Sequence, residues 1–164
     1  MEDDFDKILE EWKTRVNKKT SEIENNFDRG LLKASLYCEG KAKENAMNVI
    51  YMTNVPFNDY GEDMWSRTGL LKAAIGSGMD PIKSHSALVF CTAAYAKYIE
   101  YGTGIYAVNG DGRKTPWIFE TNTGVRVWTR GMRAKPFMGP SVFQNKEDIK
   151  TIIVKYLKEA CNDR

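Results

Sequence analysis

The sequence predicts an α+β fold, in which a long N-terminal helix precedes a small antiparallel sheet with a hairpin, flanked by short helices and a C-terminal helix. An apolar stripe of helical period runs through the first fifty residues. Two β-rich runs joined by a glycine-containing turn follow later. The 164 residues, 42% of them hydrophobic, have the size and composition of one folded domain. We expect residues 1–50 to form an arm and residues 51–164 the α+β core of that domain.

The N-terminal stripe advances about 3.67 residues per turn, the period of an ordinary amphipathic helix. A helix of about 45 residues spans roughly 68 Å, whereas a domain of this size has a diameter near 40 Å. We therefore expect the helix either to break at Gly30 or Gly40, or to project and bury its stripe against another chain. Beyond Leu36 the stripe thins to small residues, which permit close approach of a neighbouring element. Its members are Phe5, Ile8, Trp12, Val16, Ile23, Phe27, Leu31, Ala34, Cys38, Ala42, Ala46 and Val49.

The segment that follows the arm predicts a loop and then a short helix. Residues 51–67 lack periodicity and contain proline and glycine, so they indicate a loop. Thr68 is a suitable N-cap for the helical sequence 70–75, and Gly76 and Gly78 are expected to end that helix.

A strand and a helix are expected next. Residues 86–91 form a nearly continuous apolar run, which favours a central strand buried on both faces. Residues 93–101 return to helical spacing, and Gly102 stands where a left-handed C-terminal cap belongs.

The last third predicts a hairpin and a final helix. The runs 116–121 and 125–129 are joined by a short turn with a glycine at position 124. An irregular proline- and glycine-rich stretch leads to an amphipathic helix over about residues 141–160. One face of the hairpin is expected to carry Trp117, Phe119, Val125 and Val127.

Charge and composition narrow the classes of function. The net charge of +2 indicates neither a nucleic-acid nor a membrane partner, and no apolar run reaches the length of a membrane helix. The acidic start is unlike a signal peptide, and three widely spaced cysteines favour a reducing compartment. Residues 1–28 hold nine acidic and five basic side chains, whereas residues 111–135 hold six basic and two acidic ones. These are either two solvated faces or an acidic arm that meets the basic hairpin of a neighbouring subunit.

Catalytic patterns are weak. His85 is the single histidine and is expected at the surface or at a strand edge. Glu100 and Glu120 are better explained as surface or salt-bridging carboxylates than as an acid–base pair. We expect no enzymatic activity, no cofactor and no metal site, and an enzyme is the least favoured class.

The hairpin region also suggests a nucleic-acid alternative. Cations and aromatic rings alternate there as they do in single-strand binders. The cations are Arg113, Lys114, Arg126, Arg130, Arg133 and Lys135, and the rings are Trp117, Phe119, Trp128 and Phe137. Because hairpin aromatics more often build a core or an interface, DNA contact is the second hypothesis.

An ordered set of motifs over about residues 65–160 resembles the tail-component family of tailed phages typified by the tenth gene product of phage Hong Kong 97. The set consists of TGLLK at 68–72, YAKYIEYGTG at 95–104, TRG at 129–131 and AKPFMGP at 134–140. This chain departs from the family in its tryptophan-rich hairpin and in the glycine–proline that follows Phe137 and Met138.

The resemblance implies a non-enzymatic virion protein, a neck or tail-completion protein that forms a homo-oligomeric ring at the head–tail junction and is assembled in the host cytoplasm. The implied partners are head-completion or adaptor proteins and tail terminator or tube proteins, with DNA present only as it passes through the ring. A ring needs two different complementary surfaces on each subunit. We expect the subunit interface to involve Trp12, Phe27, Trp117, Trp128, Arg130, Arg133 and Phe137. The motif residues Gly69, Tyr95, Glu100, Gly102, Gly104, Gly131 and Pro136 are expected to serve the fold first. Pro136 and Pro140 are expected in rigid extended backbone, and Glu100 is expected to pair with Arg130.

Overall fold

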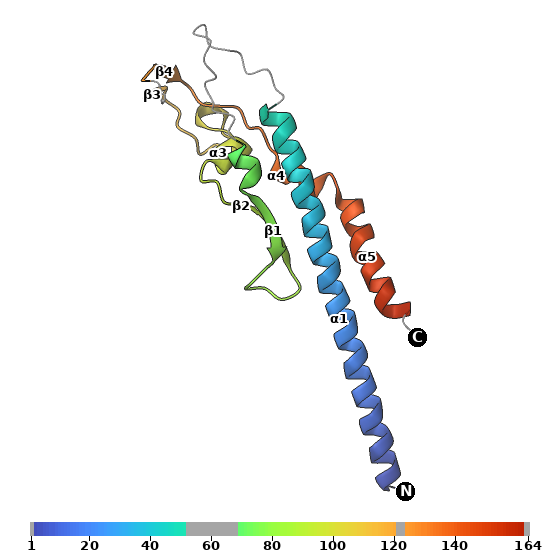
Figure 1. Cartoon of the computed structure of the whole chain (residues 1–164). Helices are drawn as coiled ribbons and strands as arrows, with labels where there is room; N and C mark the ends of the chain where they lie inside the picture. The colour runs from blue at the N-terminus through green and yellow to red at the C-terminus, as the bar shows by residue number, and fades with distance from the viewer. Residues whose placement is uncertain (1, 52–68, 121–123, 163–164) are drawn as a thin grey trace. The chain divides into compact units, whose positions relative to one another are not determined.

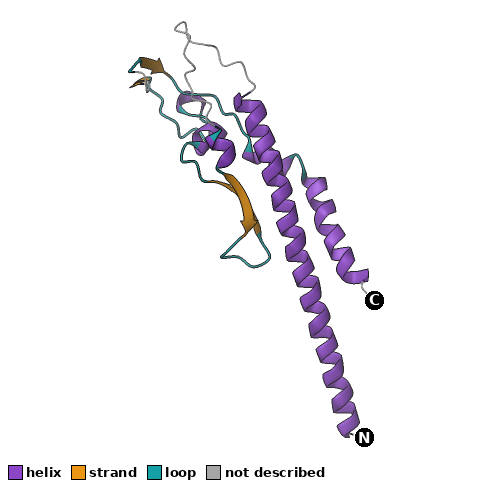
Figure 2. Ribbon diagram, viewed as in Figure 1, coloured by secondary structure: helices purple, strands orange, loops and turns teal. Residues whose placement is uncertain are grey.

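A computed structural model describes residues 2–51, 69–120 and 124–162 of the chain, and it has the predicted mixed α+β architecture (Figures 1 and 2). The expected loop at 51–67 and the cap at Thr68 fall outside the described residues, apart from Tyr51. The helices are α1 (Glu2–Ala46), the π-helical turn η1 (Met47–Tyr51), α2 (Leu70–Ala73), α3 (Ala96–Tyr101), the 3-10 turn η2 (Gly104–Tyr106), α4 (Met138–Phe143) and α5 (Lys146–Asn162). The strands are β1 (Ile75–Met79), β2 (Ala87–Cys91), β3 (Trp117–Glu120) and β4 (Arg126–Thr129).

The chain divides into two compact units. Unit 1 consists of Met1–Tyr37, Ser77–Leu88 and Lys146–Arg164, and unit 2 of Cys38–Gly76 and Val89–Asn145. The expected arm is therefore shared between them, because α1 contributes its first part to unit 1 and residues 38–46 to unit 2.

Helix α1 continues through both glycines at which a break was considered. In unit 1, Gly30 lies against α5, and a Cβ atom there would come 3.3 Å from the Cα of Ile153 and 3.3 Å from the Cβ of Tyr156. Glycine at this position thus lets the backbones of α1 and α5 approach closely. Glycine has a low helix propensity, and the packing against α5 compensates for it.

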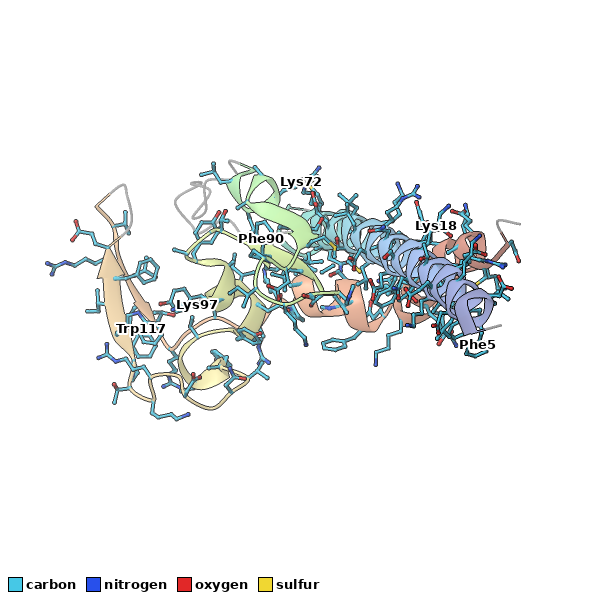
Figure 3. All side chains as sticks on the ribbon, turned by 90° about the horizontal axis from the view of Figure 1, so that it is seen from below. Phe5, Lys18, Lys72, Phe90, Lys97 and Trp117 are labelled. Atoms are coloured by element: carbon cyan, nitrogen blue, oxygen red, sulfur yellow. The ribbon has the colours of Figure 1, made fainter. Side chains whose placement is uncertain are left out.

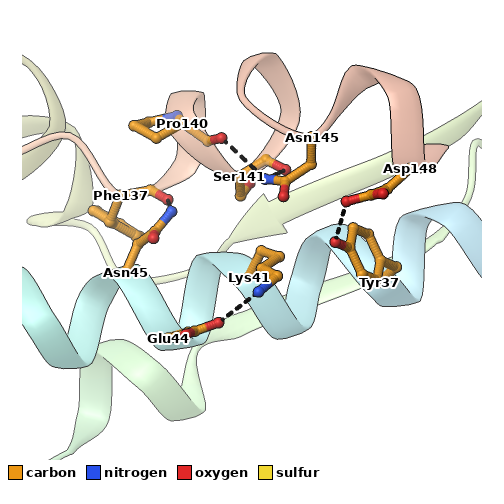
Figure 4. A network of polar contacts seen from close by, with 9 residues as sticks. All are labelled: Tyr37, Lys41, Glu44, Asn45, Phe137, Pro140, Ser141, Asn145 and Asp148. Atoms are coloured by element: carbon orange, nitrogen blue, oxygen red, sulfur yellow. Dashed lines mark hydrogen bonds and ion pairs between the residues drawn. The ribbon is translucent and has the colours of Figure 1, made fainter.

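Helix α5 packs antiparallel along α1 in unit 1. Tyr37 Oη donates a hydrogen bond to Asp148 Oδ2 at 2.7 Å (Figure 4), near the start of α5. Lys19 Nζ donates to the carbonyl oxygen of Ala160, near the end of α5. Helix α5 therefore lies beside α1 from Tyr37 to about residue 23, and the Lys19 side chain reaches the end of α5.

The core of unit 2 is built on the small residues of α1. Ala42 and Ala46 are completely buried against the ring of Phe137, which is itself 0% exposed. Asn45 Nδ2 donates to the carbonyl oxygen of Phe137 at 3.1 Å (Figure 4). The thinning of the stripe to small residues therefore serves close packing inside the chain. Leu71, Ile75 and Ala96 complete this core.

The segment after residue 69 differs from the prediction. Only α2 is helical, and Ile75 begins strand β1, in which Gly76 and Gly78 lie instead of ending a helix. Strand β1 pairs with β2, and the two form a hairpin bounded by hydrogen bonds from Thr92 N to Ala74 O and from Asp80 N to Ser86 O. Pairing with β2 across the hairpin overrides the local helical pattern.

Strand β2 is present where predicted, but it is not a central strand. Among the described residues its sheet has two strands, and its side chains alternate between half-buried and exposed positions, with Leu88 and Phe90 on the exposed side. The continuous apolar run predicts two buried faces, whereas the described residues cover only one of them.

The final helix is divided into α4 and α5 by Gln144 and Asn145. Asn145 Nδ2 donates to the carbonyl oxygen of Ser141 at 3.0 Å and to that of Pro140 at 3.4 Å (Figure 4), so its side chain binds carbonyl groups at the end of α4. Pro140 was expected in extended backbone but lies in the first turn of α4, where its missing N–H is not needed.

Candidate interaction surfaces

The N-terminal third of α1 carries a run of large apolar side chains that are exposed in unit 1. We call Phe5, Ile8, Trp12 and Val16 the arm stripe. All residues from 4 to 18 are exposed, and Trp12 and Phe5 expose 61% and 66% of their surface. Figure 3 labels Phe5 and Lys18 on this stretch, and Figure 1 shows the N-terminal part of α1 extending past the end of α5. The stripe repeats at the same helical spacing as the residues that α5 covers further along, so it has the pattern of a packing face without a packing partner.

Phe27, a predicted interface residue, is half-buried within unit 1. Its ring centroid lies 6.2 Å from that of His85. His85 is exposed at the end of the β1–β2 turn, as expected, and its Nδ1 lies 2.9 Å from Asp28 Oδ1. This hydrogen bond and the negative charge of Asp28 raise the pKa of His85. Through its contacts with Phe27 and Asp28, His85 therefore attaches the turn to α1.

The hairpin β3–β4 was correctly predicted and has two different faces. The register places Trp117 opposite Thr129 and Phe119 opposite Val127 on a half-buried face, so three of the four residues assigned to one face share it. Val125, the fourth, precedes β4.

The opposite face is formed by Ile118 and Trp128, which are direct cross-strand partners and are about 60% exposed. The guanidinium carbon of Arg130 lies 5.4 Å from the centroid of the Trp128 ring. We call Ile118, Trp128 and Arg130 the hairpin face. Sequence reasoning missed Ile118, although side chains alternate along a strand and Ile118 must therefore lie on the other face of β3 from Trp117 and Phe119.

Further cations lie over aromatic rings in unit 2. Arg113 lies 5.7 Å from the ring of Trp117, and Arg133 lies 5.0 Å from that of Tyr106. Arg130 and Arg133 are both exposed, so they are available to a partner.

Phe137 does not belong to any surface, which corrects its assignment to the subunit interface. It is the largest fully buried side chain among the described residues. Phe137 directly precedes α4, and its ring points into the core of unit 2. The side chain that was expected to contact a partner therefore packs inside its own chain.

The two glycine motifs of unit 2 interlock. Thr103 N donates to Met132 O at 2.8 Å, Ile105 N donates to Arg130 O at 3.1 Å, and Met132 N donates to Thr103 Oγ1 at 2.9 Å. A Cβ atom at Gly104 would overlap the carbonyl oxygen of Arg130, and one at Gly131 would overlap that of Thr103. Glycine is required on both sides because the two backbones touch. The motifs at 95–104 and 129–131 are thus one structural feature.

Glu100 was expected to form an ion pair with Arg130, and the structure shows that it does not. Its Oε2 accepts hydrogen bonds from the backbone N–H groups of Phe137 at 2.8 Å and Met138 at 2.9 Å, and its Oε1 accepts one from Gly139 at 2.8 Å. A negative charge at a helix start satisfies N–H groups that have no partner within the helix. Glu100 therefore fixes the start of α4 to the end of α3.

The remaining motif residues also have fold roles. Gly102 has the expected positive φ of 74°, but its ψ of −179° is extended, so it is not a left-handed α cap. A Cβ atom at Gly102 would lie 2.8 Å from Ala134 N. Gly69, with φ 74°, stands before α2, Tyr95 stands before α3, and Pro136 is exposed before the buried Phe137.

Cys38 is a free thiol that is buried in the structure. Burial raises the pKa of the Cys38 thiol, which keeps it protonated. Within residues 2–51, 69–120 and 124–162, no cluster of three histidine, cysteine or acidic side chains is placed to bind a metal ion.

Comparisons of the chain with family models, with curated proteins and with solved structures gave no match. Among the described helices, none combines the length and the apolar character that crossing a membrane requires.

Proposed function

We propose that the chain is a non-enzymatic structural protein of a tailed-phage virion, which forms a homo-oligomeric ring at the head–tail junction as a neck or tail-completion protein. The observation that carries the proposal is the arm stripe, because a single copy leaves Phe5, Ile8 and Trp12 exposed to water on a stretch of α1 that no other described residue covers. The resemblance of the ordered motifs supplies the setting.

Two separate apolar surfaces support an assembly. The arm stripe lies in unit 1 and the hairpin face in unit 2, so one subunit presents two chemically different surfaces and can contact more than one neighbour. Exposed tryptophan and arginine side chains are the residue types that contribute most to protein interfaces. We therefore assign Trp128 and Arg130 to contacts with neighbouring subunits or with the adaptor and tail proteins of the virion.

The proposal is tested by locating the protein in phage particles. Antibodies against the chain, visualised by electron microscopy on particles released by cells that encode it, are expected to label the junction of head and tail. Label confined to the capsid or the tail tip, or particles that lack the protein, would refute the proposed place.

A second candidate function is contact with DNA, favoured by the cations that lie over exposed rings in unit 2. Arg130 and Trp128 present a charged group and a stacking face together, as single-strand binders do. Fluorescence anisotropy with a labelled single strand distinguishes the two functions. Binding that weakens steeply with salt and is lost in Arg130→Gln favours DNA contact, and absence of binding at low salt excludes it.

A further inference from the structure

The exposed part of the arm is not uniformly acidic, and its charges form two opposite blocks. Residues 4–11 hold four acidic side chains and one basic one, a net charge of −3. Residues 13–19 hold four basic side chains and no acidic one, a net charge of +4. Trp12 stands between the blocks, in the middle of the arm stripe. A copy of this helix that runs in the opposite direction places each block beside its opposite, whereas a parallel copy places like charges together.

We propose that the arm stripe binds the arm stripe of a second copy of this chain, as an antiparallel helix pair whose two-fold axis passes close to Trp12. The apolar stripe provides the buried surface, and the two charge blocks determine the direction. The contact is isologous, so it closes at two copies, and it does not depend on the proposed place in the virion.

The end of α5 sets the register of this pair. Helix α5 ends at Asn162. The Tyr37–Asp148 hydrogen bond and the packing of Gly30 against Ile153 and Tyr156 set the register of the two helices, and the equal rise along both places Asn162 beside about residue 23 of α1. A partner helix that begins with Glu2 beside residue 22 therefore starts where α5 ends, and it brings Trp12 opposite Trp12 of the second copy and Ile8 opposite Val16. The same apolar face is then covered first by α5 and next by the second copy.

One flank of the stripe fits the same register. It carries Asp4, Glu11, Arg15 and Lys18, whose spacings of seven, four and three residues keep them on one side of a helix. In the antiparallel pair this flank faces its own copy. Asp4 then lies about 3 Å along the axis from Lys18 of the second copy, and Glu11 lies about as far from Arg15.

The two-fold axis repeats both pairs, so four ion pairs border the apolar contact. None of these four side chains forms an ion pair within the described part of its own chain. Their charges are therefore free to meet a second copy.

Charge reversal on this flank tests the pairing. Asp4→Lys with Glu11→Lys makes the flank wholly basic, and Arg15→Glu with Lys18→Glu makes it wholly acidic. Each double variant is expected to raise the dissociation constant of the dimer about a hundredfold, measured by sedimentation equilibrium over a wide range of protein concentration. The quadruple variant with all four changes keeps the net charge of the natural chain and restores every pair, so its constant is expected to return to within about threefold.

A second pair of variants tests the apolar contact. Trp12→Ala is expected to weaken the dimer at least about tenfold. Ile82→Ala is the matched control, because Ile82 is an apolar side chain of unit 1 that is 95% exposed in the β1–β2 turn, away from the stripe. It is expected to leave the dissociation constant unchanged. Circular dichroism checks that each variant keeps its helix content.

Three results would overturn the proposal. The first is a natural chain that stays monomeric at every concentration. The second is a basic double variant that dissociates while the acidic one does not, because the stripe would then bind a basic surface such as the hairpin. The third is a quadruple variant that fails to recover. Loss of the pair with label still at the head–tail junction would reject this inference alone, and pairing without that label would reject the proposed function alone.

Discussion

The three hydrogen bonds accepted by Glu100 predict a large loss of stability in Glu100→Gln. The substitution keeps the size and shape of the side chain but removes the charge and replaces one oxygen by an NH₂ group. One amide oxygen accepts in place of one carboxylate oxygen, and the NH₂ group then faces an N–H donor of residues 137–139. Weakening two charge-assisted bonds and turning the third into a donor–donor contact costs about 2–3 kcal/mol in free energy of unfolding.

Urea denaturation followed by circular dichroism measures this loss, and an unchanged m value shows that the unfolded state is not the cause. In a thermal melt the same loss corresponds to about 5–10 °C. Glu120→Gln is the matched control, because Glu120 is exposed on β3 and the chemical change is identical, so its effect is expected to stay within about 0.5 kcal/mol.

Two results would refute this reasoning. One is a Glu100→Gln variant as stable as the Glu120→Gln control. The other is a coupling above about 1 kcal/mol between Glu100→Gln and Arg130→Gln in a double-mutant cycle, because Arg130 has no contact with the carboxylate in the structure.

Three further substitutions test the packing and the single histidine. Gly104→Ala introduces a methyl group that overlaps the facing backbone, and it is expected to lower the free energy of unfolding by about 3 kcal/mol. Gly40→Ala, in open space on α1, is expected to raise it by about 0.5–1 kcal/mol. Equal melting temperatures of the two variants would contradict both expectations. Phe137→Ala is expected to cost about 3–5 kcal/mol in urea denaturation, and a loss below about 1 kcal/mol would show that the ring is not in the core. Because Asp28 raises the pKa of His85, the stability from this pair is fully present below about pH 6.5 and is lost as pH rises through the raised pKa. The stability difference between the natural chain and Asp28→Asn should therefore shrink from pH 6 to pH 8, and an NMR titration of the single histidine should show a lower pKa in that variant; an unchanged pKa would contradict the assignment.

The elements that the sequence predicted well are those whose pattern repeats locally. The arm helix follows from twelve apolar residues at a constant period, and the hairpin from two β-rich runs around a glycine turn. Strand β1 was missed because a short sequence with two leucines and two alanines favours a helix, and only its pairing with β2 makes Ile75 extended.

The candidate surfaces were predicted in part. Trp12 and Trp128 are exposed, as an interface role requires, whereas Phe137 is buried and Ile118 was overlooked. A tryptophan or phenylalanine fits a core and an interface equally well, so composition alone does not distinguish them. Glu100 was recognised as a motif residue, but its partners are N–H groups about forty residues away, which no local pattern encodes.

By itself the sequence determined the secondary structure of the arm and of the β3–β4 hairpin, and the two charge blocks of the arm. It left open whether the helix breaks at Gly30 or Gly40 or continues through them. The tertiary structure decided that the helix is continuous, that Phe137 is in the core, and that Glu100 fixes α4 to α3. The physical reason is that period and turn chemistry act between neighbours in the chain, whereas burial and hydrogen-bond partners depend on which distant segments meet.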